Sequence, residues 1–474
     1  MRTSFLPRTA AALLAALPAS LPAQTPFTVP EIPVERYALP NGLTVLLSPD
    51  HSSSVVTVDV WYHVGSKNET PGRTGFAHLF EHMMFQGSAH IPYGVHPKTI
   101  ESVGGVLNGS TQDDRTNYYE TVPSNQLATA LWLESDRMGF LLPALDQRKL
   151  DAQRDVVKNE RRQRVDNQPF GAADEAIRRA LYAPTNPYSW PVIGSMADLS
   201  AATLDDVETF FRTYYAPNNA TLAVVGDFDV ARAKALIARY FGPIPSGPPV
   251  PRPAIAPVTL AAERRLVLED RRAREPELRI IWPTVPLRHP DEPALSVLAR
   301  TLVQDRTSRL TKLLVYDRQV ATRVSAWQGA KEGVGTLEID VTPRPGVSLA
   351  TVEQLVDSAL AALRTTAPIT EAEVERYRRY TQVMTVLSLD GSMMRAEMLL
   401  YGETFAGDPA YYRTSTAALL AVTPADLARV AATYLTPGRV VLSMVPAGKL
   451  ALIAAPDSSY TNVTPSSNAP SNAP

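Results

Sequence analysis

The sequence predicts an α+β fold of two related domains, each a mostly antiparallel sheet packed with helices. Strand-like and helix-like patterns are mixed along the 474 residues, without the regular βαβ alternation of a parallel fold. A proline-rich stretch divides the chain near its middle, and one helix–turn–strand pattern occurs in each half. Because a chain of this length is too long for one ordinary core, two domains are expected.

Hydrophobic spacing predicts the individual elements. Alternating apolar residues indicate strands at residues 43–47 and 57–62. Apolar residues at helical spacing indicate long helices at residues 125–141 and 148–165.

The proline-rich stretch sets the expected domain boundaries. Seven prolines fall between residues 243 and 257, where they exclude a helix or a central strand. We therefore predict an N-terminal domain at residues 31–242, a linker at residues 243–258 and a C-terminal domain at residues 259–453.

A repeated pattern indicates internal duplication. In the first half the pattern consists of Thr203, Asp206, Thr213, Tyr214, Pro217 and Leu222. The same residue types recur 220 positions later, at Thr423, Asp426, Thr433, Tyr434, Pro437 and Leu442. Each copy is typical of a helix capped by threonine, a turn marked by proline and an apolar strand. The alternative is coincidence between two common helix–turn–strand units.

The two ends of the chain have their own composition. Arginines at positions 2 and 8 precede an apolar stretch, which predicts an export signal at residues 1–23 and a periplasmic protein. The alternative, an N-terminal membrane anchor, is disfavoured because the apolar run is short and contains Pro18. No membrane span is expected in the mature chain. Residues 457–474 are rich in Ser, Asn, Pro and Thr, which predicts a disordered tail.

Charge and cysteine content exclude several classes of partner and site. Lysine and arginine number 46 against 48 acidic residues, so no net basic field attracts nucleic acid. The chain contains no cysteine, so a zinc site must use histidine and carboxylate ligands. Five of the seven histidines have no partner at ligand spacing and are expected to be surface or packing residues: His51, His63, His90, His96 and His289.

The segment at residues 75–85 carries the candidate chemistry on a predicted buried helix. His78 and His82 are four positions apart, so one helix face presents both rings to a single ion, and Glu81 borders that face. Two neutral imidazoles and a carboxylate supply two zinc ligands and a general base for zinc-bound water. The alternative is a pair of hydrogen-bonded core histidines beside a solvated glutamate.

The order His-x-x-Glu-His reverses the common zinc-protease motif and resembles that of the inverzincins. The flanking residues resemble the pitrilysin-type (M16) metallopeptidase family, in particular its half-sized bacterial (M16B-like) members. Residues 104–111 and 116–119 are similar to the family's strand pair beside the active site, and residues 156–163 to its third-ligand helix. The resemblance covers about residues 32–447 and is stronger in the first half.

The resemblance implies further site residues. Glu160 would be the third zinc ligand, on a second helix, whereas without the motif it would be one more solvated charge. Gln153 stands where many relatives carry a second carboxylate. A substrate chain would add as a strand along a sheet edge formed by Asn108, Gly109, Ser110 and Thr111; the alternative is an edge strand with no such role.

The resemblance also implies a function and a partner. The expected function is a zinc-dependent endopeptidase acting on unfolded or short peptides, with Glu81 as general base; the alternatives are a non-catalytic scaffold subunit and a dedicated peptide-maturation protease. Relatives are expected to carry an Arg and a Tyr, seven residues apart, that hold the substrate. The matching segment here offers Val315 and Thr322. A heterodimer with an M16-like subunit carrying this clamp is therefore expected, with a homodimer as the alternative.

Overall fold

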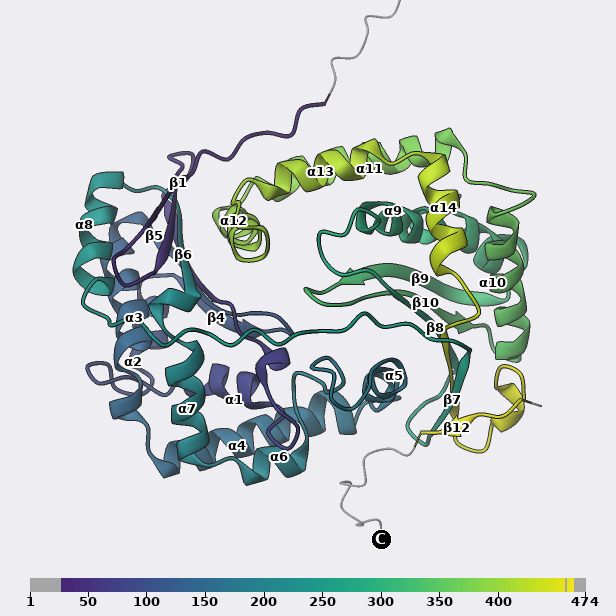
Figure 1. The fold of residues 1–474 in the computed structure, drawn as a ribbon, viewed down its shortest axis with the longest axis horizontal. Coiled ribbons are helices and arrows are strands. Elements are labelled where there is room, and N and C mark those ends of the chain that lie inside the picture. The colour runs from purple at the N-terminus through teal and green to yellow at the C-terminus, as the bar shows by residue number, and fades with distance from the viewer. Residues whose placement is uncertain (1–26, 457, 464–474) are drawn as a thin grey trace, which may run out of the picture.

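The computed structural model describes residues 27–456 and 458–463, which form two six-stranded sheets with surrounding helices (Figure 1). The expected export signal lies outside these residues. Among the described residues, no helix combines the length and the apolar character needed to cross a bilayer.

The first half contains the sheet with strand order β1-β2-β6-β3-β5-β4, in which β2 and β6 are parallel and the other neighbours antiparallel. Its strands are β1 Glu35–Ala38, β2 Thr44–Pro49, β3 Val55–Tyr62, β4 Val106–Thr111, β5 Thr116–Pro123 and β6 Ala220–Gly226. Its helices are α1 Phe76–Met83, α2 Val95–Ser102, α3 Leu127–Phe140, α4 Gln147–Arg161, α5 Ala173–Leu181, α6 Met196–Ala201, α7 Leu204–Tyr214 and α8 Val230–Phe241.

The second half contains the sheet with strand order β12-β7-β11-β8-β10-β9, in which β7 is parallel to both of its neighbours. Its strands are β7 Arg264–Asp270, β8 Glu277–Thr284, β9 Ala321–Ala330, β10 Gly335–Pro343, β11 Val440–Pro446 and β12 Thr461–Asn462. Its helices are α9 Glu292–Val303, α10 Leu349–Leu363, α11 Glu371–Ser388, α12 Ser392–Ala406, α13 Tyr411–Ala421 and α14 Pro424–Tyr434. Short 3-10 or π turns occupy Ser66–Asn68, Ser124–Gln126, Leu142–Ala144, Arg162–Asp166, Pro217–Asn219, Thr311–Asp317 and Leu450–Leu452.

The repeated sequence pattern corresponds to equivalent elements of the two halves. Thr203 caps α7 and Thr423 caps α14, each in a capping box with the aspartate three residues later. The strands that follow, β6 and β11, occupy the same place in the two strand orders. The predicted α+β fold of two related, mostly antiparallel halves is thus confirmed.

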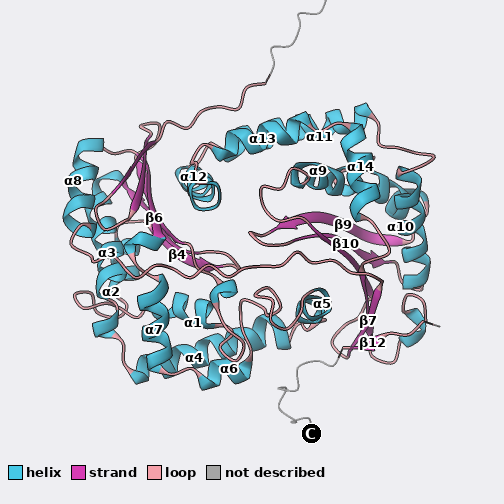
Figure 2. Ribbon diagram, in the orientation of Figure 1, coloured by secondary structure: helices cyan, strands magenta, loops and turns pink. Residues whose placement is uncertain are grey.

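Each sheet is covered in part by a helix from the other half. Helix α12 packs on β3 and β6 of the first sheet, where Leu399 and Leu400 join Trp61 and Val225 in one apolar cluster. Figure 2 shows α3 and α12 on opposite sides of this sheet. In return, α5 packs against β7 and β11 of the second sheet. Because each half buries apolar surface of the other, the chain holds its two sheets in a fixed relation.

The linker between the halves and the C-terminal segment can be compared with the boundaries expected from the sequence. Helix α8 ends at Phe241 and β7 begins at Arg264, which supports our proposal of a linker at residues 243–258. Residues 457–474 are expected to form a disordered tail, but residues 461–463 pair with the second sheet. There β12 lies parallel to β7, and the backbone N–H of Val463 donates to the Val267 carbonyl at 2.7 Å. The open edge of β7 offers backbone groups that composition alone does not reveal.

Candidate metal centre

Helix α1 is short and almost completely buried. It begins after Gly75, whose φ of 85° favours glycine, and a Cβ there would approach the Ile193 carbonyl oxygen to 2.8 Å. The carboxylate of Glu69 accepts hydrogen bonds from the backbone N–H groups of Gly75 and Ala77, at 2.9 and 2.8 Å. Glu69 therefore satisfies donors that the start of a helix leaves free and places a negative charge where the helix dipole favours one. The packing and this cap fix the face that carries the histidines.

Three predicted ligands converge between α1 and α4. The Nε2 atoms of His78 and His82 lie 3.7 and 3.2 Å from Oε2 of Glu160, and the two rings are 4.8 Å apart at their centroids. One ligand atom from each residue lies within 4.8 Å of the others. Tetrahedral zinc with bonds of about 2.0–2.1 Å holds its ligand atoms about 3.3 Å apart, so these residues fit the ion.

The charges around the three ligands favour a cation. Burial lowers the pKa of His78 to about 3, with further lowering by His82 and Arg164, so its ring is neutral and keeps a lone pair for a metal. The two carboxylate oxygens of Glu160 have different partners. Oε1 pairs with Arg164 at 2.7 Å, whereas Oε2 lies near Nε2 of both histidines. Arg164 follows α4 in a π turn, one helical turn after Glu160. The ion pair thus orients the carboxylate and leaves Oε2 as the oxygen that would bind a metal ion.

Gln153 lies on α4, buried, seven residues before Glu160. The buried Nδ1 of His78 has no hydrogen-bond partner among the described residues. The second ring nitrogen of a metal-binding histidine is ordinarily held by a carboxylate, a carbonyl or water. Among the described residues, no protein group therefore fixes the His78 ring through Nδ1.

Glu81 contacts the edge strand β4. The hydroxyl of Thr111 donates to Oε2 of Glu81 at 2.6 Å. Burial raises the pKa of Glu81, opposed by the Thr111 hydrogen bond and by His82, and reinforced by Glu160. A carboxylate of raised basicity held beside two histidines is suited to proton transfer.

The four residues predicted to form the substrate edge have different surroundings. Asn108, Gly109, Ser110 and Thr111 all lie on this edge strand. A Cβ at Gly109 would lie 3.1 Å from the Tyr118 ring and 3.2 Å from the Phe85 ring, so a side chain there would press against two rings of the domain. The hydroxyl of Ser110 donates to the Asn117 side chain at 2.7 Å, and Asn117 in turn donates to Glu397 on α12. Of these four residues, Thr111 is the one whose side chain hydrogen bonds to Glu81.

Replacing Thr111 by valine tests the contact with Glu81. If the chain cleaves peptides as its sequence predicts, we expect Thr111→Val to lower kcat about tenfold, because a hydrogen bond to a charged group is lost while side-chain volume is kept. Thr111→Ser should restore most of the activity, since serine keeps the hydroxyl. Steady-state kinetics on one quenched peptide measures the effect. Equal rates for the valine and serine variants would contradict this role.

A second buried group was missed by the sequence interpretation. His96 on α2, Glu120 on β5 and Glu134 on α3 come within metal-binding distance of one another. His96 contacts Glu120 directly, while Arg137 pairs with Glu134 and lies 3.9 Å from Glu120. Burial raises the pKa values of Glu120 and Glu134 to about 7. Because a guanidinium already compensates the carboxylates, we interpret this group as an ion-pair network of the core.

Comparison with known proteins assigns the family. Residues 44–189 match the family model "Insulinase (Peptidase family M16)", and residues 201–380 match "Peptidase M16 inactive domain". An uncharacterized zinc protease of Mycobacterium tuberculosis is 31% identical over 307 residues, which cover 62% of this chain and 68% of that protein. The chain belongs to peptidase family M16. Its relatives also include the zinc protease PqqE of Helicobacter pylori, 28% identical over 76% of this chain and 80% of that protein.

Solved structures of M16 proteins share the fold. A protease from Helicobacter pylori aligns with a TM-score of 0.82 at 26% identity, covering 87% of this chain and 99% of that chain. The periplasmic protease PqqL from Escherichia coli aligns with a TM-score of 0.72 at 21% identity, covering 87% of this chain but 47% of that chain. The M16 fold described here thus corresponds to about half of the larger protein.

Proposed function

We propose that this chain is a zinc-dependent endopeptidase that hydrolyses unfolded or short peptides. His78, His82 and Glu160 would hold the ion, and Glu81 would act as general base. The observation that carries the proposal is the convergence of two imidazole nitrogens and one carboxylate oxygen within 4.8 Å, beside a second carboxylate held by Thr111. The zinc proteases among the relatives support the choice of metal.

The chain's own groups account for the proton transfers of peptide hydrolysis. Zinc, when bound, would polarise the peptide carbonyl and lower the pKa of a coordinated water. Glu81 accepts the proton of the attacking water, while Thr111 keeps its carboxylate in place. Glu81 then returns this proton to the amine nitrogen that leaves.

The edge strand supports the proposed class of substrate. Strand β4 has β5 on one side and an open edge on the other. A peptide could add to that edge by backbone hydrogen bonds, which requires an extended segment. Folded proteins seldom present such a segment, so unfolded or short peptides are the substrates that fit.

We also propose that the active enzyme contains a second M16-like subunit that carries the Arg/Tyr clamp, with a homodimer as the alternative. Val315 packs against the second core, and the hydroxyl of Thr322 donates to the Thr342 carbonyl at 3.2 Å. Neither side chain has the charge or the aromatic ring of a clamp. Relatives named mitochondrial-processing peptidase subunit beta, and a PqqL chain about twice as long, support pairing of two such units.

The periplasmic neighbour PqqL supports our proposal that the chain is exported with a signal at residues 1–23. The first alternative function, a scaffold subunit, is disfavoured by the complete set of four site residues. The second, a dedicated maturation protease, would use the same site on one peptide.

Metal analysis and peptide cleavage on the purified mature chain test the proposed function. We expect about one zinc per chain, cleavage of unstructured peptides that a chelator abolishes, and recovery when zinc is restored. Size-exclusion chromatography, with and without a candidate partner, would assign activity to an oligomer. A chain that binds no zinc and cleaves no peptide in any assembly would contradict the proposed function and favour the scaffold alternative.

A further inference from the structure

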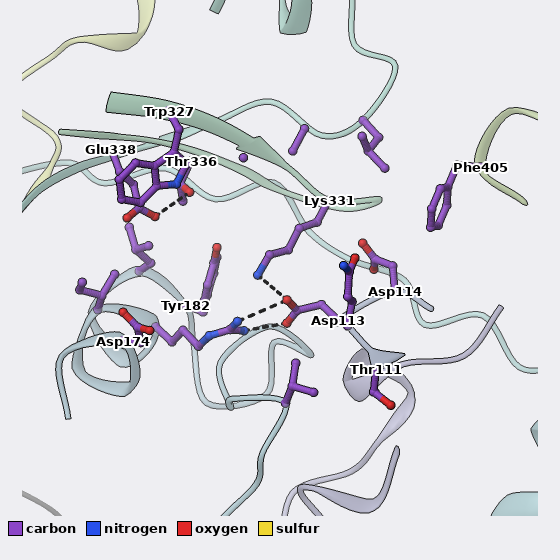
Figure 3. A pocket seen from close by; sticks show the side chains of 18 of the residues that line it. Thr111, Asp113, Asp114, Asp174, Tyr182, Trp327, Lys331, Thr336, Glu338 and Phe405 are labelled. Carbon is purple, nitrogen blue, oxygen red and sulfur yellow. Dashed lines mark hydrogen bonds and ion pairs between the residues drawn. The ribbon is translucent and has the colours of Figure 1, made fainter. Parts of the chain in front are cut away.

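A cavity of about 620 Å³ lies between the two halves and begins beside the proposed general base. Thr111, which hydrogen bonds to Glu81, lines one end of it. Its opposite wall is formed by β9 and β10 of the second sheet (Figure 3). A peptide lying at β4 could therefore extend a side chain into this space.

The cations that line the cavity are already paired. Arg178 pairs with Asp113 at 2.7 Å. Lys331 pairs with the same carboxylate at 2.9 Å, as a dashed line in Figure 3 shows. Arg279 pairs with Asp174 at 2.6 Å. An anionic guest would have to compete with carboxylates already in place, so these groups do not favour one.

Glu338 on β10 differs from the other carboxylates of the lining. It accepts a hydrogen bond from Thr336 at 3.1 Å, and among the described residues no lysine, arginine or histidine nitrogen forms an ion pair with it. Burial raises its pKa, and the Thr336 hydrogen bond and the more distant charges of Arg279 and Lys331 oppose that shift. A cation entering the cavity would relieve the penalty of burial.

Aromatic rings line the cavity, and Trp327 lies beside this carboxylate (Figure 3). Trp327 is the direct cross-strand partner of Glu338, and more than a third of its surface is exposed. Tyr182, after α5, and Tyr401 and Phe405, on α12, complete the lining from two other elements. Aromatic faces attract cations, and the long apolar stems of lysine and arginine pack against such rings.

We propose that this cavity is a subsite for a lysine or arginine side chain of the peptide substrate, with Glu338 as its anionic anchor and Trp327 as its aromatic wall. The proposal rests on the proposed peptidase function and adds a substrate class to it: peptides with a basic residue at a fixed distance from the cleaved bond. Thr111 and Glu338 lie on opposite sides of the cavity in Figure 3, and their separation would set that distance.

A positional scan tests the subsite. One lysine is moved stepwise along a quenched peptide that is otherwise uncharged, and each peptide is compared with the same peptide carrying norleucine. For the active enzyme we expect one position at which lysine raises kcat/KM about tenfold over norleucine. This factor is the size expected when a desolvated cation contacts a carboxylate and an aromatic ring. In Glu338→Gln the ratio should fall to about one.

Two controls separate the possible failures. Glu277→Gln makes the same change on neighbouring β8, outside the cavity lining, and should keep the wild-type ratio. Binding to the Glu81→Gln variant, measured by calorimetry, should show the same preference for lysine without cleavage. Cleavage with no preferred lysine position, or a preference that persists in Glu338→Gln, would overturn the subsite while leaving the peptidase in place. Absence of cleavage for all peptides, in every assembly, would overturn the proposed function instead.

Discussion

Glu81→Gln is expected to lose peptide cleavage by about 10²–10⁴-fold while keeping the metal. Glutamine has nearly the same shape, and its carbonyl can still accept the Thr111 hydrogen bond that glutamate accepts at 2.6 Å. It cannot take a proton from water at neutral pH, so the loss should fall on kcat. Single-turnover cleavage of a quenched peptide, together with zinc content, measures the two properties on one sample.

A matched substitution shows whether the loss is specific. Glu101 is an exposed glutamate on α2, and Glu101→Gln removes one carboxylate without touching the centre. This control should cleave at the wild-type rate. If Glu81→Gln kept full activity, another group would be the base, and the assignment made from the motif would be wrong.

The parts of the site that lie on one helix could be predicted from the sequence. His78, Glu81 and His82 share α1, where spacing alone decides which side chains lie on one face. The capping boxes at Thr203 and Thr423 are local in the same sense, because each involves a threonine and an aspartate three residues apart. Such features depend on a few dihedral angles and survive any tertiary arrangement.

The parts that depend on tertiary packing could not be predicted in this way. Glu160 is brought to the histidines by the packing of α4 on α1, and it was assigned only through the family resemblance. The hydrogen bonds from the start of α1 to Glu69 and from Thr111 to Glu81 join different segments of the chain. No helical or strand spacing in the sequence indicates such contacts. The packing of α12 on the first sheet and of α5 on the second is harder still to predict. The apolar face of a helix shows that the helix covers a sheet, but not which sheet it covers.

Glu160→Gln is expected to weaken zinc binding strongly. Loss of a group that only hydrogen bonds to a metal ligand lowers affinity roughly 10–100-fold, and loss of a ligand should cost more. The substitution removes the anionic ligand whose oxygen lies 3.2 Å from Nε2 of His82 and 3.7 Å from Nε2 of His78, and leaves the two imidazoles. Zinc at a hundredfold excess over its Kd stabilises a folded protein by about 2.7 kcal/mol, which raises Tm measurably. The wild-type chain should therefore show a clear rise in Tm on zinc addition, and the variant almost none.

The control for this experiment lies on the same helix. Asp155→Asn removes an exposed carboxylate from α4 and should keep both the Tm rise and the zinc content. Because Tm reports metal binding without any substrate, the result does not depend on a partner subunit or on the identity of the peptide. An undiminished Tm rise in Glu160→Gln would mean that the ion is held by the two histidines and some other group. Glu160 would then serve only to pair with Arg164, and the third ligand would have to be sought elsewhere around α1.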